Sequence, residues 1–322
     1  MHFFREDKVM TKGNSAIMNQ TIKLFKHTRS GSYATRDRYL KSCKTFVSFL
    51  DEQFKMKNLK NLQDKHLVAY AEYRQAQGIS DKTLKNDLGA IRYLHDMIPD
   101  AKYELASNQQ LKSEYDVYLD KTIAVTGDRA WTNSEYKEMQ QLLSTQAPNS
   151  RVAAITSDVM TISRTMGLRV SEAVCMRRSQ AEKALRTGHY EVLGEAKNGM
   201  HRSVPLSPEV RQLLTDRLPH IERGGRLFIA EGEKAHQVVN RIEKHLERYR
   251  GAVETLEGAA KRLDIFNEVN PLTFHGLRYS YVQDRMTDLQ ASGLSWKAAA
   301  KIVTQEVGHG RVEVIKVYTN GK

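Results

Sequence analysis

Two stretches in the first third of the chain carry apolar residues at the spacing of one helix face. In residues 32–54 the apolar side chains form a stripe, and most cationic side chains lie away from it. Residues 78–99 repeat this design, with Ser80 as a predicted N-cap and Pro99 as the stop. A shorter helix ending at Gly78 lies between the two. These patterns predict a compact bundle of four or five helices across residues 16–120.

The second half of the chain combines helical stretches with one predicted hairpin. We expect one helix to end at Gly167 and another to start near Ser171. The stretch HYEVLGEAKNGMHRSVPL has Asn198-Gly199 between two extended segments, which favours a two-residue type I′ turn with Lys197 beside its tip. The predicted fold class is therefore mainly α with a small β-hairpin or sheet, an α+β arrangement.

A break in the helical pattern predicts two domains, which suits a chain of 322 residues. Residues 121–132 contain Gly127 and show no sustained periodicity, so we place a linker there. The predicted organisation is a flexible extension over residues 1–15, a helical domain over residues 16–120 and a second domain over residues 133–322.

The chain is basic in both halves. It holds 50 Lys and Arg against 38 Asp and Glu, a formal charge of +12, which favours a polyanionic partner such as nucleic acid. A solvated, self-repelling surface is the plainer interpretation. Cys43 and Cys175 suit a reducing cytoplasm, because two cysteines make no disulfide framework and have no metal-ligand spacing. No apolar run approaches the roughly 18 residues of a membrane span, so we expect a cytoplasmic protein with no membrane partner.

Six side chains of the second half could together carry phosphoryl-transfer chemistry. His275 and Arg278 would project from one helix face, and Arg169 stands at a helix break where it can point into a cleft. Two guanidinium groups on one phosphate would neutralise the charge of a pentacoordinate transition state. Taken singly, each residue is more often structural, so the set is what matters. The candidates are Arg169, Lys197, His275, Arg278, His309 and Tyr318.

The nucleophile of such a site is predicted to be Tyr318. A phenol has a pKa of about 10, but a pocket of Arg, Lys and His stabilises the phenolate. No acidic cluster suits a metal ion, and no glycine-rich loop suits a nucleotide phosphate. We therefore expect a reaction with no metal and no cofactor.

Four segments, in order along the chain, resemble the motifs of the tyrosine recombinases, which include phage integrases, Xer-type resolvases and Cre-like enzymes. The segments are TMGLRVSEAV, GEAKNGMHRSVPL, TFHGLRYSY and VGHGRVEVIKVYTN. This resemblance implies a core-binding (SAM-like) DNA-binding domain over residues 16–120 and a catalytic domain over residues 133–322. It also implies that Arg169 and Arg278 clamp the scissile phosphate, that Lys197 protonates the leaving 5′ oxygen and that Glu172 orients the site.

The resemblance further implies that His275 assists proton transfer, that His309 hydrogen-bonds the phosphate and that Tyr318 attacks it. The implied activity is site-specific DNA recombination through a 3′-phosphotyrosyl intermediate and a Holliday junction. The implied partners are double-stranded DNA sites, bound by a homotetramer with a dimer on each of two sites, and accessory or directionality factors. Two alternatives remain open, namely a type IB topoisomerase and a catalytically silent DNA-binding relative.

Two further expectations concern DNA contacts and the end of the chain. Cationic residues on the two predicted helices of the first domain are candidates for DNA binding, either in the grooves or at the backbone only. Because the sequence ends soon after Tyr318, we expect this tyrosine to be mobile until DNA and neighbouring subunits fix it. The DNA-binding candidates are Arg36, Arg38, Lys41, Lys44, Lys82, Lys85 and Arg92.

Overall fold

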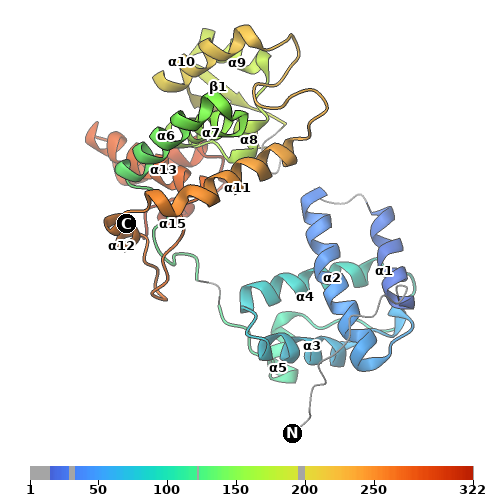
Figure 1. Ribbon diagram of the computed structural model, residues 1–322. Helices are drawn as coiled ribbons and strands as arrows, with labels where there is room; N and C mark the ends of the chain where they lie inside the picture. Colours follow the sequence, from blue (N-terminus) through green and yellow to red (C-terminus); the bar gives the residue numbers. More distant parts are fainter. Residues whose placement is uncertain (1–14, 29–32, 122, 195–199, 322) are drawn as a thin grey trace. The chain divides into compact units, whose positions relative to one another are not determined.

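The computed structural model describes residues 15–28, 33–121, 123–194 and 200–321. The chain divides into two compact units, Met1–Thr122 and Ile123–Lys322, which Figure 1 shows in blue to cyan and in green to red. No helix in these described ranges has both the length and the apolarity of a membrane span.

Unit 1 is a helical bundle, as the apolar spacing predicts. Its core is formed mainly where α1, α2 and α4 pack on one another, with buried Phe46, Leu50, Leu88 and Ile91 among its members. The predicted N-cap Ser80 accepts a hydrogen bond from the backbone of Thr83 at 3.4 Å. The helices are α1 (Ala16–His27), α2 (Tyr33–Phe54), α3 (Asp64–Ala76), α4 (Asp81–Asp96) and α5 (Asn108–Tyr115).

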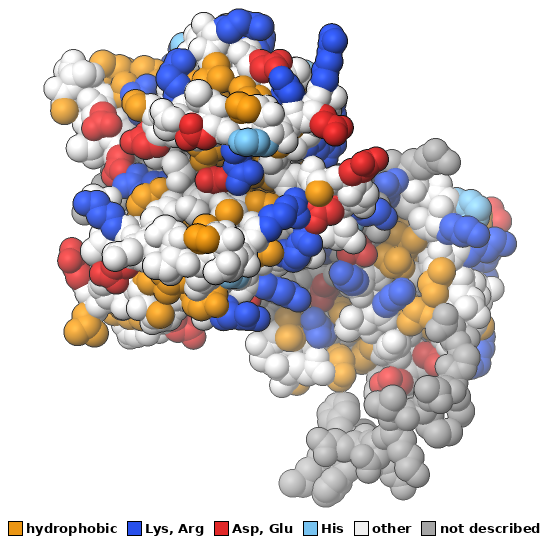
Figure 2. Space-filling view, turned by 45° about the horizontal axis from the view of Figure 1, so that its top comes forward, with side chains coloured by type: hydrophobic (Ala, Val, Ile, Leu, Met, Phe, Trp, Pro, Cys, Tyr) orange, Lys and Arg blue, Asp and Glu red, His pale blue; other side chains and the backbone are white. Residues whose placement is uncertain are grey.

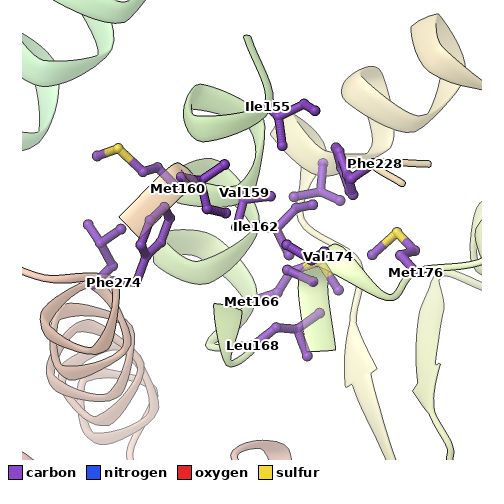
Figure 3. Close-up of a cluster of buried hydrophobic side chains, with 14 of the residues drawn as sticks. Ile155, Val159, Met160, Ile162, Met166, Leu168, Val174, Met176, Phe228 and Phe274 are labelled. Carbon is purple, nitrogen blue, oxygen red and sulfur yellow. The ribbon is translucent and has the colours of Figure 1, made fainter. Parts of the chain in front are cut away.

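Unit 2 is built around one buried helix, α7 (Arg151–Met166), which packs against α6, α10, α11 and α13 (Figure 1). Figure 3 shows apolar side chains of α7 meeting Phe228 and Phe274, which come from distant parts of the chain. Its other helices are α6 (Asn133–Gln146), α8 (Val170–Val174), α9 (Arg178–Thr187), α10 (Pro208–Arg217), α11 (Ala235–Val253), α12 (Leu256–Lys261), α13 (Phe274–Ala291), α14 (Trp296–Glu306) and α15 (Ile315–Tyr318).

The predicted hairpin is present as a two-stranded antiparallel sheet. Strands β1 (His189–Val192) and β2 (Arg202–Pro205) pair antiparallel, and the pairing runs from His189↔Pro205 to Val192↔Arg202. The predicted two-residue type I′ turn, with Lys197 and the Asn198-Gly199 pair, lies outside the described residues.

The end of α7 is fixed by Gly167, as the sequence predicts. This glycine has φ +63°, the left-handed conformation common after a helix, and its N–H donates to the carbonyl of Ser163. A Cβ at this position would lie 2.3 Å from a ring carbon of Tyr281, so the close packing of α7 on α13 also requires glycine. The chain then turns through buried Leu168 and delivers Arg169 to the start of α8.

Candidate active site

Arg169 is held at the start of α8 by a carboxylate one turn further on. Its backbone N–H donates to Oε2 of Glu172 at 2.8 Å, and its Nη1 donates to Oε1 of the same residue at 2.8 Å. Glu172 is fully buried and is also paired with Arg202. Burial raises the pKa of Glu172, but hydrogen bonds from Arg202 and the charges of both arginines outweigh it and lower the pKa below its usual range. Glu172 is therefore a buried anion that orients Arg169.

His275 and Arg278 lie on the first turns of α13, which begins after the N-cap Thr273. The His275 side chain is exposed, whereas Arg278 is 1 % exposed. The Arg278 guanidinium donates to Tyr318 Oη at 3.2 Å, to the carbonyl of Gly167 at 2.6 Å and to the carbonyl of Val307. Arg278 therefore joins the end of α7, the end of α14 and α15 around one buried positive charge.

Tyr318 is packed into the site rather than mobile. Its side chain is 4 % exposed, and its Oη lies 2.9 Å from His309 Nε2 and 3.2 Å from Arg278 Nε. Its ring lies against Tyr279, with ring centroids 4.6 Å apart, and its backbone carbonyl accepts from Gln283 at 2.9 Å. The expectation of a mobile tyrosine is wrong for this structure, because packing and hydrogen bonding hold α15 on α13.

A cavity of about 500 Å³ opens beside these groups. Its charged and imidazole lining residues are Arg129, Arg169, Arg250, His275 and Arg278, together with the carboxylates Glu243 and Glu247. The four guanidinium groups outnumber the two carboxylates, so the cavity suits an anion with several oxygens, such as a phosphodiester. Within the described residues, no group of three or more His, Cys, Asp or Glu side chains could hold a metal ion.

Family models match both units of this chain. The model described as "Phage integrase, N-terminal" matches residues 15–100, and the model described as "Phage integrase family" matches residues 132–322. The chain belongs to the phage integrase family of tyrosine recombinases. None of the curated protein sequences matches it.

Solved structures of tyrosine recombinases share the fold of this family member at low sequence identity. A lambda integrase dimer bound to a COC′ core site is 16 % identical, with 95 % of each chain covered and a TM-score of 0.62. The Tn1549 transposon integrase in complex with transposon right-end DNA is 14 % identical, with 94 % of each chain covered and a TM-score of 0.57. XerH recombinase in a post-cleavage complex with its difH substrate is 16 % identical, with 94 % of this chain and 80 % of that chain covered and a TM-score of 0.58.

The structure brings five of the six predicted integrase site residues together, and the sixth, Lys197, lies outside the described residues. Sequence patterns alone do not single out Arg129, Arg202 or Arg250. Arg129 lies in the irregular stretch that the sequence predicts to be a linker, and Arg250 lies in a charged helix with the pattern of a solvated surface. Arg202 has one available signal, because it starts the second strand of the predicted hairpin within a recognised motif.

The DNA-binding candidates of unit 1 are either partly buried or exposed. Among the partly buried ones, Arg36 donates to the carbonyl of Thr28 at 3.2 Å, and Arg92 donates to the carbonyl of Ala106 at 2.8 Å. Lys85 donates to the carbonyl of Asp120. Lys and Arg side chains are spread over the visible surface (Figure 2). The exposed candidates are Arg38, Lys41, Lys44 and Lys82, and of these Lys41 pairs with Asp37 at 2.8 Å.

We expect His309 to stay neutral at physiological pH. Its burial, followed by the charges of Arg278, Arg169 and His275, lowers its pKa to about 4. A histidine in the unfolded chain has a pKa of about 6.5. Between pH 4 and that value, the unfolded chain therefore binds a proton that the folded chain excludes. The contribution of His309 to stability is therefore lost as the pH falls through this window.

The titration can be measured by NMR on protein with ¹⁵N-labelled histidine. His309→Gln identifies the resonance and should make stability less dependent on pH between 4 and 6.5. A pKa of His309 above 6 in the free protein would contradict the expectation.

Proposed function

We propose that this chain is a site-specific DNA recombinase, an integrase, in which Tyr318 is the nucleophile. The observation that carries the proposal is the position of the phenol. Its oxygen contacts both a half-buried imidazole, His309, and the buried guanidinium of Arg278, a residue that lines the cationic cavity. This is the environment in which a phenol can lose its proton and attack a bound phosphate.

Strand cleavage would proceed by in-line attack at phosphorus. Arg169, His275 and Arg278 would hold the non-bridging oxygens of the scissile phosphate and neutralise the charge that develops there. Tyr318 Oη forms the new bond to phosphorus while the bond to the 5′ oxygen breaks. The proton of the phenol passes to a neutral imidazole, with His309 Nε2 already in contact. The leaving 5′ oxygen takes a proton from Lys197, and the product is a 3′-phosphotyrosyl bond with a free 5′ hydroxyl.

Rejoining would reverse the same chemistry with a new strand. The 5′ hydroxyl of a partner strand attacks the phosphotyrosyl bond, restores the DNA backbone and returns the proton to Tyr318. Because the phosphotyrosyl ester conserves the bond energy, no nucleotide is consumed. The low-identity structural neighbours were solved with DNA, which supports double-stranded DNA as the partner here. We extend the proposal to a dimer on each of two sites and a tetramer during exchange.

The proposal is tested by trapping the covalent intermediate on duplexes of randomised sequence. The full chain is incubated, without added metal or nucleotide, with duplexes that carry a randomised segment and a nick. The nick lets the short cleaved fragment diffuse away, so the intermediate accumulates. We expect a protease-sensitive protein–DNA adduct on a denaturing gel, and sequencing of the trapped duplexes should reveal one enriched site.

The other functional assignments predict different results. A type IB topoisomerase would relax supercoiled DNA that lacks the enriched site, with no second site needed. A catalytically silent relative would enrich a sequence in a native binding assay and give no adduct. Either result would remove the recombinase proposal.

A further inference from the structure

Arg202 occupies a buried position directly behind the candidate active site. It is the first residue of β2 and is 8 % exposed. Its guanidinium grips both oxygens of Glu172, with Nη2 2.5 Å from Oε2 and Nη1 3.1 Å from Oε1. A forked pair of this kind fixes the carboxylate in angle as well as in distance.

Because Arg202 binds both oxygens of Glu172, the carboxylate accepts only one hydrogen bond from the guanidinium of Arg169. Oε1 accepts from Arg169 Nη1 and Arg202 Nη1, while Oε2 accepts from the Arg169 backbone and Arg202 Nη2. Arg169 therefore uses only one guanidinium nitrogen, Nη1, to bind the Glu172 side chain. Its Nε and Nη2 make no hydrogen bond to any other described residue, and Arg169 lines the 500 Å³ cavity. Those two nitrogens form one edge of the fork and are available to a phosphate.

Arg202 also fixes the segment that leads to His309. Its Nε donates to the backbone carbonyl of Glu306 at 2.8 Å, and a Cβ on Gly308 would lie 3.0 Å from its side chain. The side chain of Glu306 is itself fixed by Tyr281 Oη at 2.8 Å and by Arg285 at 2.9 Å. Arg202 thus contacts the residues that hold Arg169 and the turn that carries His309.

We propose that Arg202 is a positioning residue of the active site, an inference that rests on the proposed recombinase function. Through Glu172 it directs the Nε and Nη2 atoms of Arg169 into the cavity. Through its hydrogen bond to the Glu306 carbonyl it fixes the position of the turn that carries His309. Because Arg202 is the first residue of β2, it also connects the β1–β2 pair to the phosphate site. Without the fork, Glu172 would turn both oxygens to Arg169 and draw its guanidinium out of the cavity.

The test compares two buried arginines that have the same kind of partner. Arg202→Lys keeps the charge and removes the fork. The matched control is Arg262→Lys. Arg262 is fully buried and hydrogen-bonds both oxygens of the fully buried Glu135 in the same unit, but it does not line the cavity. Adduct formation is measured in a single turnover at saturating DNA and is normalised to the folded fraction.

We expect Arg202→Lys to form the adduct about 10²-fold more slowly, the size of effect that a misplacement of roughly 1 Å produces. The DNA concentration at half-saturation should change less than about threefold, since the DNA contacts are preserved. Arg262→Lys should keep a rate within about threefold of the wild type at equal folded fraction. Equal losses of rate in the two variants would overturn the positioning role.

A pH profile separates positioning from general loss of structure. In Arg202→Gln the buried Glu172 loses its main stabilising partner, so its pKa should rise. Glu172 then takes up a proton at a higher pH, so the step in the rate profile that reports ionisation of Glu172 moves upward in pH. A profile that merely scales down without moving would count against the inference.

The structure of Arg202→Lys gives an outcome that does not depend on cleavage. We expect the guanidinium of Arg169 to turn onto Glu172 and leave the cavity. If Arg169 and His309 keep their places in that variant, the inference fails even if the wild type cleaves DNA. Absence of an adduct with the wild-type chain would instead refute the proposed function, and the variant structure would still decide the positioning role.

Discussion

Replacing Tyr318 by phenylalanine should abolish the covalent adduct while leaving the fold and DNA binding in place. The substitution removes one oxygen, and with it the two hydrogen bonds to His309 and Arg278. The ring contacts with Tyr279 and His275 are kept, so α15 should stay docked on α13. Because the nucleophilic atom itself is lost, we expect adduct formation to fall by at least about 10³-fold, to the detection limit of a denaturing gel.

Tyr279→Phe is the matched control for this experiment. Its ring lies against that of Tyr318, and the residue is also buried. Burial raises the pKa of Tyr279 and outweighs the charge of Arg129, which lowers it, so this phenol stays protonated. We expect Tyr279→Phe to lower the rate by no more than a few-fold. An adduct that persists in Tyr318→Phe, or vanishes equally in Tyr279→Phe, would show that another residue attacks the phosphate.

The parts of the fold that were predictable from sequence are those with a local cause. Helix α4 begins at Ser80 because its hydroxyl caps the first turn, and its apolar stripe faces the core of unit 1. Helix α7 ends at Gly167 because only glycine suits both the left-handed backbone and the contact with Tyr281. In each case the determining residues lie in the element itself, so spacing alone indicates the structure.

The parts that were not predictable depend on partners far away in the sequence. The hairpin was predictable from its two extended segments, but its strands also pack on helices elsewhere in the unit, β1 on α9 and β2 on α14. Arg202 reaches the carbonyl of Glu306, 104 positions further along the chain. The docking of Tyr318 likewise depends on Arg278, 40 positions earlier. Sequence spacing near the chain end suggested a free tail, since it carries no information on these contacts.

Removing the charge of Arg262 should destabilise unit 2 more than any surface substitution. Arg262 and Glu135 are both fully buried, and they pair through two hydrogen bonds of 2.7 and 2.9 Å. Arg262 also binds Glu254 at 2.8 Å and the carbonyl of Asn270 at 3.0 Å. In Arg262→Met the carboxylate of Glu135 would remain buried without its cation, and we expect a loss of about 3–5 kcal/mol in the free energy of unfolding.

The loss can be measured by urea unfolding followed by tryptophan fluorescence. Both tryptophans of the chain, Trp131 and Trp296, lie in unit 2, so the signal reports that unit alone. The control is Arg151→Met, because Arg151 pairs with Glu233 while remaining half-exposed, and such a pair contributes only about 0–1 kcal/mol. Equal losses in the two variants would contradict a special role for burial.

The pH dependence of the same variant gives a second check with a defined sign. In the wild type, burial raises the pKa of Glu135, but the hydrogen bonds from Arg262 and the backbone outweigh it and leave the pKa lowered. The ionised pair therefore stabilises the fold above the usual glutamate pKa, and this stabilisation is lost as the pH falls. In Arg262→Met the buried carboxylate should have a raised pKa and should be relieved by protonation. The difference in stability between wild type and variant should therefore shrink between pH 7 and pH 5. Replacing both partners, as in Glu135→Leu with Arg262→Met, should recover most of the loss at pH 7, because no buried charge is then left unpaired.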